Sequence, residues 1–135
     1  YLTDRYQTVC IDGKLSEPVI MKFSVPRGSV LSPNFYTMYT KPVGFICIKH
    51  GINQHFNADD SQLYLSFKPA DQASKVVTIT RVEQCLKEII SWMNSNMLKL
   101  NADKTELILF SNQKHSKLVE NLELEIGDTS IKPSE

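Results

Sequence analysis

The sequence lacks the features that mark membrane, secreted or strongly basic proteins. No apolar run approaches the roughly 18 residues that a membrane helix needs, and no secretory signal peptide is present. The 15 basic residues balance the 15 acidic ones, so the formal net charge is zero. This balance excludes a histone-like binder whose affinity rests on overall basicity. We therefore expect an intracellular protein, cytoplasmic or nuclear, with no membrane partner and with any nucleic-acid contact confined to a local patch.

Patterned cysteines and glycines are also missing. The three cysteines (Cys10, Cys47 and Cys85) are odd in number and widely spaced, and no C-x-x-C occurs. This argues against both a disulfide framework and a structural zinc site. Cys47 and Cys85 fall on the apolar faces of predicted helices, which predicts buried, reduced thiols. The five glycines form no G-x-x-x-x-G-K phosphate loop.

The length and composition of the chain indicate one ordinary folded domain. The chain has 135 residues, of which 41% are hydrophobic and 22% charged, as in a globular interior and not as in disorder. No internal repeat, low-complexity tract or linker of convincing composition interrupts it. Because the first residue is Tyr1 and not Met, we expect the chain to be a piece of a longer protein.

The first third of the sequence predicts a hairpin and then helix. Two β-rich runs, 7–11 and 19–25, flank Asp12-Gly13, a strong hairpin dipeptide. Ser32-Pro33 reads as a helix start, with Ser32 as the N-cap. Because proline lacks the N–H group and restricts the residue before it, Pro42 predicts that this helix ends near residue 40. A shorter helix should follow, with Val43, Ile46 and Cys47 on one face and Gly51 as its C-terminal cap.

The remainder predicts a second hairpin, a long helix and further strands. Residues 57–61 are the expected turn between strands that end at Phe56 and begin at Gln62. A helix is expected from Asp71 to Asn96. Its apolar stripe comprises Val76, Ile79, Val82, Leu86, Ile89, Ile90 and Met93. Strands are expected over 98–100 and 105–110, and a terminal hairpin over 122–131 turns at Gly127-Asp128. The sum is an α+β chain with the long helix laid over an antiparallel sheet.

Chemistry is most strongly indicated by the adjacent carboxylates of Asp59 and Asp60 at the hairpin tip. Mg²⁺ prefers carboxylate oxygens and keeps waters that substrate phosphates can displace. Two such ions roughly 3.5–4 Å apart can clamp the attacking and leaving oxygens of a phosphoryl transfer. Taken alone, the pair is more typical of a solvated turn than of a metal site.

The Asp59-Asp60 pair belongs to one of three motifs that follow one another along the sequence. Residues 25–33 read VPRGSVLSP, residues 55–64 read HFNADDSQLY and residues 92–106 read WMNSNMLKLNADKTE. Together they resemble the reverse transcriptase of non-LTR (LINE-type) retrotransposons. That family shows a P-Q-G-S-x-L-G-P loop and helix, a Y/F-A-D-D hairpin and a W…N-x-L-K-L-N-x-x-K-T-E segment. The resemblance covers essentially the whole chain.

The resemblance implies a fold and a domain assignment. Residues 1–135 would be a partial reverse transcriptase domain: the antiparallel Asp-Asp hairpin and packed helices of a right-hand polymerase palm, with the segment that follows. The fingers, the strand that carries the first catalytic aspartate and the thumb are expected to be missing. In the family that aspartate joins the hairpin pair in holding the metals, and the aspartates upstream of the pair are here Asp4 and Asp12.

It also implies residue roles. Asp59 and Asp60 would be catalytic ligands of Mg²⁺, with Mn²⁺ as an alternative ion. Lys104 would neutralise charge on the incoming triphosphate, although an exposed lysine beside Asp103 and Glu106 is an equal alternative. Contacts to the nucleotide or template are implied for Arg27, Gly28, Ser29 and Asn57. A glycine at position 28 would let the backbone lie close to the forming base pair.

Departures from the family pattern bear on activity. Arg27 replaces a glutamine with a permanent cation, Asn57 replaces the aromatic residue before Ala-Asp-Asp, and Ser32 and Asn34 also differ. We expect a fragment of an RNA-directed DNA polymerase whose parent uses RNA template, DNA primer and dNTP in two-metal nucleotidyl transfer. With one metal ligand absent, this chain alone is expected to be inactive. The alternatives are a non-catalytic retroelement remnant and a host-used nucleic-acid-binding module.

Overall fold

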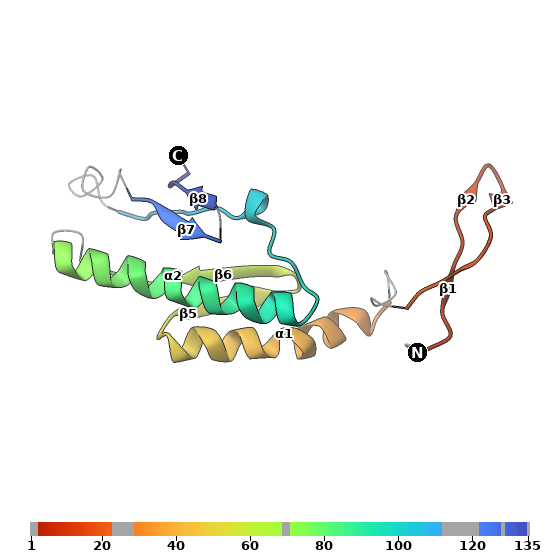
Figure 1. Ribbon diagram of the computed structural model, residues 1–135, viewed down its shortest axis with the longest axis horizontal. Helices are drawn as coiled ribbons and strands as arrows, with labels where there is room; N and C mark the ends of the chain where they lie inside the picture. Colours follow the sequence, from red (N-terminus) through yellow and green to blue (C-terminus); the bar gives the residue numbers. More distant parts are fainter. Residues whose placement is uncertain (1–2, 23–28, 69–70, 112–121, 128, 135) are drawn as a thin grey trace. The chain divides into compact units, whose positions relative to one another are not determined.

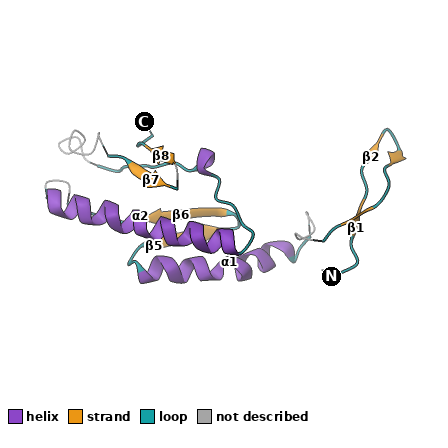
Figure 2. Ribbon diagram, viewed as in Figure 1, coloured by secondary structure: helices purple, strands orange, loops and turns teal. Residues whose placement is uncertain are grey.

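The described residues of the chain form two long helices and several short antiparallel hairpins (Figures 1 and 2). The structure is a computed structural model that describes residues 3–22, 29–68, 71–111, 122–127 and 129–134. It divides into two compact units, Tyr1–Met38 and Tyr39–Glu135. The α+β class is confirmed. The single antiparallel sheet is not, because the strands in the described ranges pair as four separate two-stranded sheets.

The first unit contains a narrow ribbon of four two-residue strands. β2 (Cys10–Ile11) pairs with β3 (Lys14–Leu15) across Asp12-Gly13, and β1 (Tyr6–Gln7) pairs with β4 (Val19–Ile20). Asp12 and Gly13 both have positive φ, 50° and 76°, as the primed turns of tight hairpins require. The predicted turn is therefore confirmed. The strand predicted over 19–25 ends at Ile20, and its last three residues lie outside the described ranges.

Helix α1 (Ser32–Lys49) continues through Pro42, so the predicted break near residue 40 is wrong. Proline inside a helix costs roughly 3 kcal/mol, because a backbone hydrogen bond is lost and the ring crowds the preceding turn. The turn that follows buries Val43 and Ile46, and burial stabilises by about 1.5–3 kcal/mol for each such side chain. The free energy gained by this burial offsets the cost of the proline. One helix therefore forms where two were predicted. Its first residue is Ser32, which was predicted to be the N-cap.

The C-terminus of α1 is closed by Gly51, as predicted. Gly51 has φ +64°. Its N–H donates to the carbonyl of Ile48 at 2.9 Å, and the N–H of Ile52 donates to that of Cys47 at 2.9 Å. This pair of bonds is the Schellman motif, which satisfies the last helical carbonyls. The chain thereby turns back, and Ile52 enters the core at the start of the next strand.

Helix α2 (Gln72–Ser95) has the ends that the sequence predicted. The Asp71 side chain caps it by accepting from the N–H of Ala73 at 3.0 Å, and Asn96 is its C-cap. Most of the predicted stripe faces the core, but Val76 does not, since 53% of it is exposed. Residues 39–49 of α1 and helix α2 lie side by side and antiparallel (Figure 1). Among the described residues, no helix could cross a membrane.

One face of α2 also packs on the last hairpin. β7 (Leu124–Ile126) and β8 (Thr129–Ile131) pair around the predicted turn, and Leu124 and Ile126 form a core cluster with Leu86 of α2. The strands predicted over 98–100 and 105–110 are wrong. A 3-10 helix, η1 (Ala102–Lys104), follows the first stretch, and the second forms an isolated bridge between Leu107 and Pro133. Because Pro133 has no N–H to donate, it cannot extend a ladder there.

Candidate functional site

The Asp-Asp pair lies at the tip of a tight hairpin. Strands β5 (Asn53–Asn57) and β6 (Asp60–Tyr64) pair in register from Asn53↔Tyr64 to Asn57↔Asp60. The turn is therefore Ala58-Asp59 alone, shorter than the turn predicted over 57–61. Asp59 is the second turn residue, and Asp60 is the first residue of β6, directly opposite Asn57. The hairpin thus brings three of the predicted site residues together.

The turn holds Ala58 in a backbone conformation that L-residues rarely adopt. Its φ is +54°, in the region where a Cβ costs roughly 1–2 kcal/mol. A Gly or Asn would adopt this conformation more easily, so the Ala-Asp dipeptide carries no ordinary turn signal. Strain of this kind persists only where surrounding structure enforces it, and it is frequent at functional sites.

The two faces of the hairpin differ sharply. Cross-strand partners share a face. One face carries Gln54 and Leu63, which are partly buried, and the other is exposed along its length. The exposed face is polar or amphipathic throughout and comprises Asn53, His55, Asn57, Asp60, Gln62 and Tyr64. Asp60 therefore belongs to a solvent-facing surface rich in hydrogen-bonding side chains.

The other face anchors the hairpin to the helices. An ideal Cβ built on Gly44 of α1 would lie 2.9 Å from Nε2 of Gln54 and 3.5 Å from a ring carbon of Phe56. Glycine therefore allows β5 to lie against the helix. Leu63 and Leu65 pack on the core cluster of α1 and α2. Gln54 Oε1 is buried without a hydrogen-bond partner in the described part of the chain, a feature that the sequence did not indicate.

The donor set at the tip suits a hard cation as part of a site. Asp59 and Asp60 are both exposed, and their side chains form no hydrogen bond or ion pair with the described residues. Their carboxylate oxygens are thus accessible, and such oxygens are the ligands that Mg²⁺ prefers. Within the ranges described, no group of three His, Cys, Asp or Glu side chains could hold a metal ion. The described residues therefore offer a pair of ligands and not a closed set.

The remaining predicted site residues lie elsewhere. Lys104 ends η1 and is exposed. Ser29 belongs to the first unit, where its Oγ accepts from the N–H of Leu31 at 3.3 Å just before α1. Arg27 and Gly28 lie outside the described residues. The structure thus brings together Asn57, Asp59 and Asp60, and among the described residues no hydrogen bond or ion pair joins Lys104 to them.

A second polar cluster joins the end of α1 to α2. Both carboxylate oxygens of Glu88 accept from Lys49 Nζ, at 2.8 and 2.9 Å, and Nε2 of His50 lies 2.8 Å from Glu88 Oε2. These hydrogen bonds, from Lys49 first and then from His50, lower the pKa of Glu88. Sequence spacing did not reveal this cluster, because its members lie 38 or 39 positions apart. It fastens the two helices and presents no carboxylate free for a ligand.

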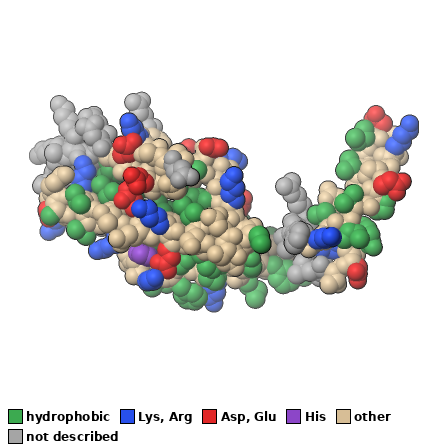
Figure 3. All heavy atoms as spheres, in the orientation of Figure 1, with side chains coloured by type: hydrophobic (Ala, Val, Ile, Leu, Met, Phe, Trp, Pro, Cys, Tyr) green, Lys and Arg blue, Asp and Glu red, His purple; other side chains and the backbone are tan. Residues whose placement is uncertain are grey.

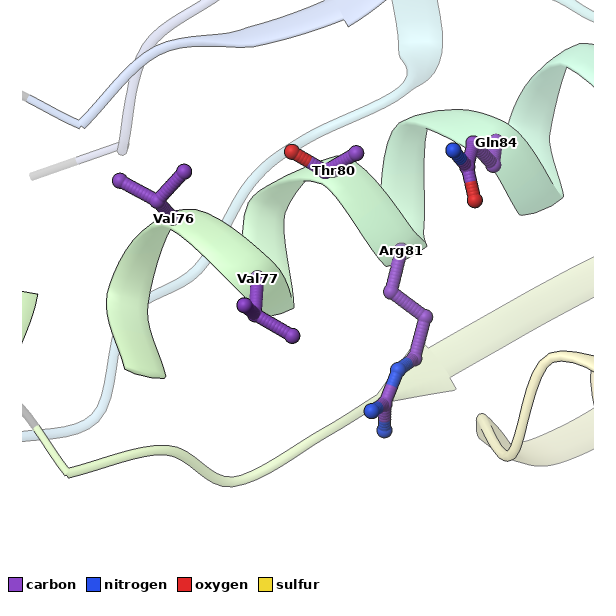
Figure 4. Close-up of a pocket in the computed structure, with 5 residues that line it drawn as sticks. All are labelled: Val76, Val77, Thr80, Arg81 and Gln84. Carbon is purple, nitrogen blue, oxygen red and sulfur yellow. The ribbon is translucent and has the colours of Figure 1, made fainter. Parts of the chain in front are cut away.

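Two other surfaces are hollow or apolar. Val76, Val77, Thr80, Arg81 and Gln84 line a hollow of about 280 Å³ along the outer side of α2 (Figure 4). It contains no acid, base or nucleophile suited to catalysis. Hydrophobic side chains also gather on the surface over α1 (Figure 3), where Phe45 and Ile48 are exposed. The hairpin tip is therefore the strongest candidate for chemistry.

Comparison with known proteins shows that the chain is similar to part of a transposon protein. The chain is 28% identical over 130 residues to a Drosophila melanogaster protein named "Probable RNA-directed DNA polymerase from transposon BS". The match covers 93% of this chain but 14% of that protein, so the chain spans a small part of its relative's length. No protein-family model matches the chain, and no solved structure does. Almost the whole chain is thus similar to part of a transposon polymerase.

Proposed function

We propose that the chain is a piece of the RNA-directed DNA polymerase of a LINE-type retrotransposon, and that β5 and β6 form the metal-binding hairpin of its palm. The observation that carries this proposal is the tip of the hairpin, where a strained two-residue turn and the first residue of β6 present adjacent, exposed carboxylates with no partner among the described residues. The similarity to a transposon polymerase along 93% of the chain supports it. The partners would be an RNA template, a DNA primer and dNTP.

In this proposal Asp59 and Asp60 hold Mg²⁺, or Mn²⁺ in its place. Bound divalent ions supply charge neutralisation and orientation to phosphoryl transfer. The contribution of the chain is to hold two carboxylates on a hairpin that is anchored through Leu63 and Leu65 to the core, because catalysis of this kind depends on positioning. In this proposal a further carboxylate, from outside the described residues, completes the ligand set.

The other implied residues keep their roles as part of the same proposal. Asn57, opposite Asp60, contacts the nucleotide or template from the exposed face of the hairpin. Arg27, Gly28 and Ser29, which precede α1 in the sequence, do so as well, and Lys104 meets the triphosphate. Because the described residues place no third ligand beside the pair, the 135-residue chain alone should not incorporate dNTP on an RNA template.

The proposal is tested in a chimera. The matched 130-residue region of the full-length Drosophila transposon polymerase is replaced by this chain, and template-dependent dNTP incorporation is measured with Mg²⁺. We expect incorporation by the chimera, and a loss of at least about 100-fold when Asp59→Asn or Asp60→Asn removes a ligand charge. Asp103→Asn, at another exposed aspartate, is the matched control and should keep the activity.

Two results would overturn the proposal. One is unchanged incorporation by the Asp59→Asn and Asp60→Asn chimeras. The other is a chimera that keeps the circular dichroism and primer–template binding of the parent but incorporates nothing. That second result would favour the non-catalytic alternatives, a retroelement remnant or a nucleic-acid-binding module.

A further inference from the structure

Two thiols meet in the middle of the hydrophobic core. Cys47 lies on α1 and Cys85 on α2, and both have 0% exposure, which makes them the largest fully buried side chains among the described residues. They belong to one core cluster, and their thiols hydrogen-bond to each other. The two cysteines therefore lie at the interface between α1 and α2, which run side by side and antiparallel (Figure 1).

The surroundings of the pair favour the protonated, reduced state. Burial raises the pKa of both thiols, and the neighbouring Cys47 adds to the effect on Cys85. The thiolate is the reactive species, so neither sulfur reacts readily while the helices are packed. Reaction requires a brief local opening of the helix interface, and reclosing then brings the second sulfur against the first.

We propose that Cys47 and Cys85 form a reversible disulfide that locks α1 to α2 beneath the β5–β6 hairpin. A disulfide needs two cysteines whose side chains approach closely, and the side chains of Cys47 and Cys85 are in contact within one buried cluster. The proposal is independent of the polymerase function, since it rests on the core and not on the aspartates.

The oxidant in this step is a low-molecular-mass disulfide. One protein thiolate attacks it, forms a mixed disulfide and releases one small thiolate. The second protein thiolate then attacks the protein sulfur of that mixed disulfide and releases the other small thiolate. The two protein thiols lose two protons and two electrons in all, and the small disulfide is reduced to two thiols.

A disulfide between α1 and α2 should reduce the local opening of the β5–β6 hairpin. Leu63 and Leu65 of the hairpin segment pack on the cluster that contains both cysteines, as does Val82. The cross-link would join positions 38 residues apart, and such a closure removes much of the freedom of the unfolded chain. Amides of residues 53–64 should therefore exchange with solvent roughly tenfold or more slowly in the oxidised chain.

The test uses the full chain with Cys10→Ser, because Cys10 is the exposed cysteine and would otherwise capture the reagent. The chain is treated with oxidised glutathione, and peptide mapping by mass spectrometry follows the product. We expect a Cys47–Cys85 linked peptide, no retained glutathione, slower hydrogen exchange at residues 53–64 and full reversal by dithiothreitol.

A stable glutathione adduct, a disulfide-linked dimer or unreacted thiols after prolonged treatment would each overturn the proposal. Cys47→Ala and Cys85→Ala are the second arm. Each should convert the product into a glutathione adduct of the remaining cysteine. Because the first arm keeps both core cysteines, its result does not depend on whether these variants fold.

Discussion

The buried thiol of Cys85 should make the stability of the chain fall steeply at alkaline pH. Burial, together with the neighbouring Cys47, raises the pKa of Cys85 from 9.0 to about 12. The folded state therefore holds this proton more tightly than the unfolded state does. The resulting stabilisation is fully present below pH 9 and is lost as the pH rises toward 12.

The size of the effect follows from the two pKa values. Between them, each pH unit lowers the free energy of unfolding by about 1.4 kcal/mol. The loss reaches about 4 kcal/mol at pH 12, a large part of the 5–15 kcal/mol that is usual for a domain. Cys47, whose pKa is also raised by burial, acts in the same direction.

Urea unfolding followed by circular dichroism, from pH 8 to 11 and in reductant, measures this loss. The chain with Cys10→Ser is compared with one that also carries Cys85→Val, which keeps a side chain of similar size but no ionisable group. Lysines and tyrosines titrate in both chains, so the difference isolates Cys85. We expect the two curves to diverge by about 1.4 kcal/mol per pH unit above pH 9. Parallel curves would refute the reasoning.

Three further changes probe the hairpin, the helix end and the polar cluster. Ala58→Gly should raise the free energy of unfolding by about 0.5–1 kcal/mol, because glycine adopts φ +54° without strain but has more freedom when unfolded; a thermal melt that shows lower stability would contradict this. Gly51→Ala should cost about 1 kcal/mol, since φ is +64° there and the nearest atom to the new Cβ is an ordinary 3.9 Å away; an unchanged urea midpoint would argue against it. The hydrogen bonds that lower the pKa of Glu88 also stabilise the folded state. This stabilisation is present above about pH 4.5 and is lost on further acidification. Glu88→Gln should therefore flatten the acid limb of stability against pH, and an acid limb as steep as that of the parent chain would disprove the assignment.

Local signals predicted local structure well. Asp71 and Asn96 bracket α2 as the sequence indicated, and the Asp12-Gly13 turn forms. The prediction at Pro42 failed because the packing of the next turn outweighs the local preference against proline. The single sheet failed because strand pairing is set by distant partners, as at Leu107, which meets the donor-less Pro133.

The candidate site was predictable only in part. Adjacency in the sequence was enough to single out Asp59 and Asp60, but the pairing of Asn57 with Asp60 depends on a turn that Ala-Asp does not signal. The contact between Cys47 and Cys85 depends on the packing of two helices and could not be read from spacing. The sequence therefore indicates candidate residues, and the tertiary structure shows which of them lie close together.

Mn²⁺ titration of the ¹⁵N-labelled chain measures whether the hairpin tip binds a divalent cation, as we propose. Paramagnetic broadening of amide signals detects even weak binding near each residue. We expect broadening centred on residues 58–60 that is lost in Asp59→Asn and Asp60→Asn and kept in Asp12→Asn, which alters another turn carboxylate. Broadening at Asp12 that equals or exceeds that at residues 58–60, or that persists in both hairpin variants, would contradict it.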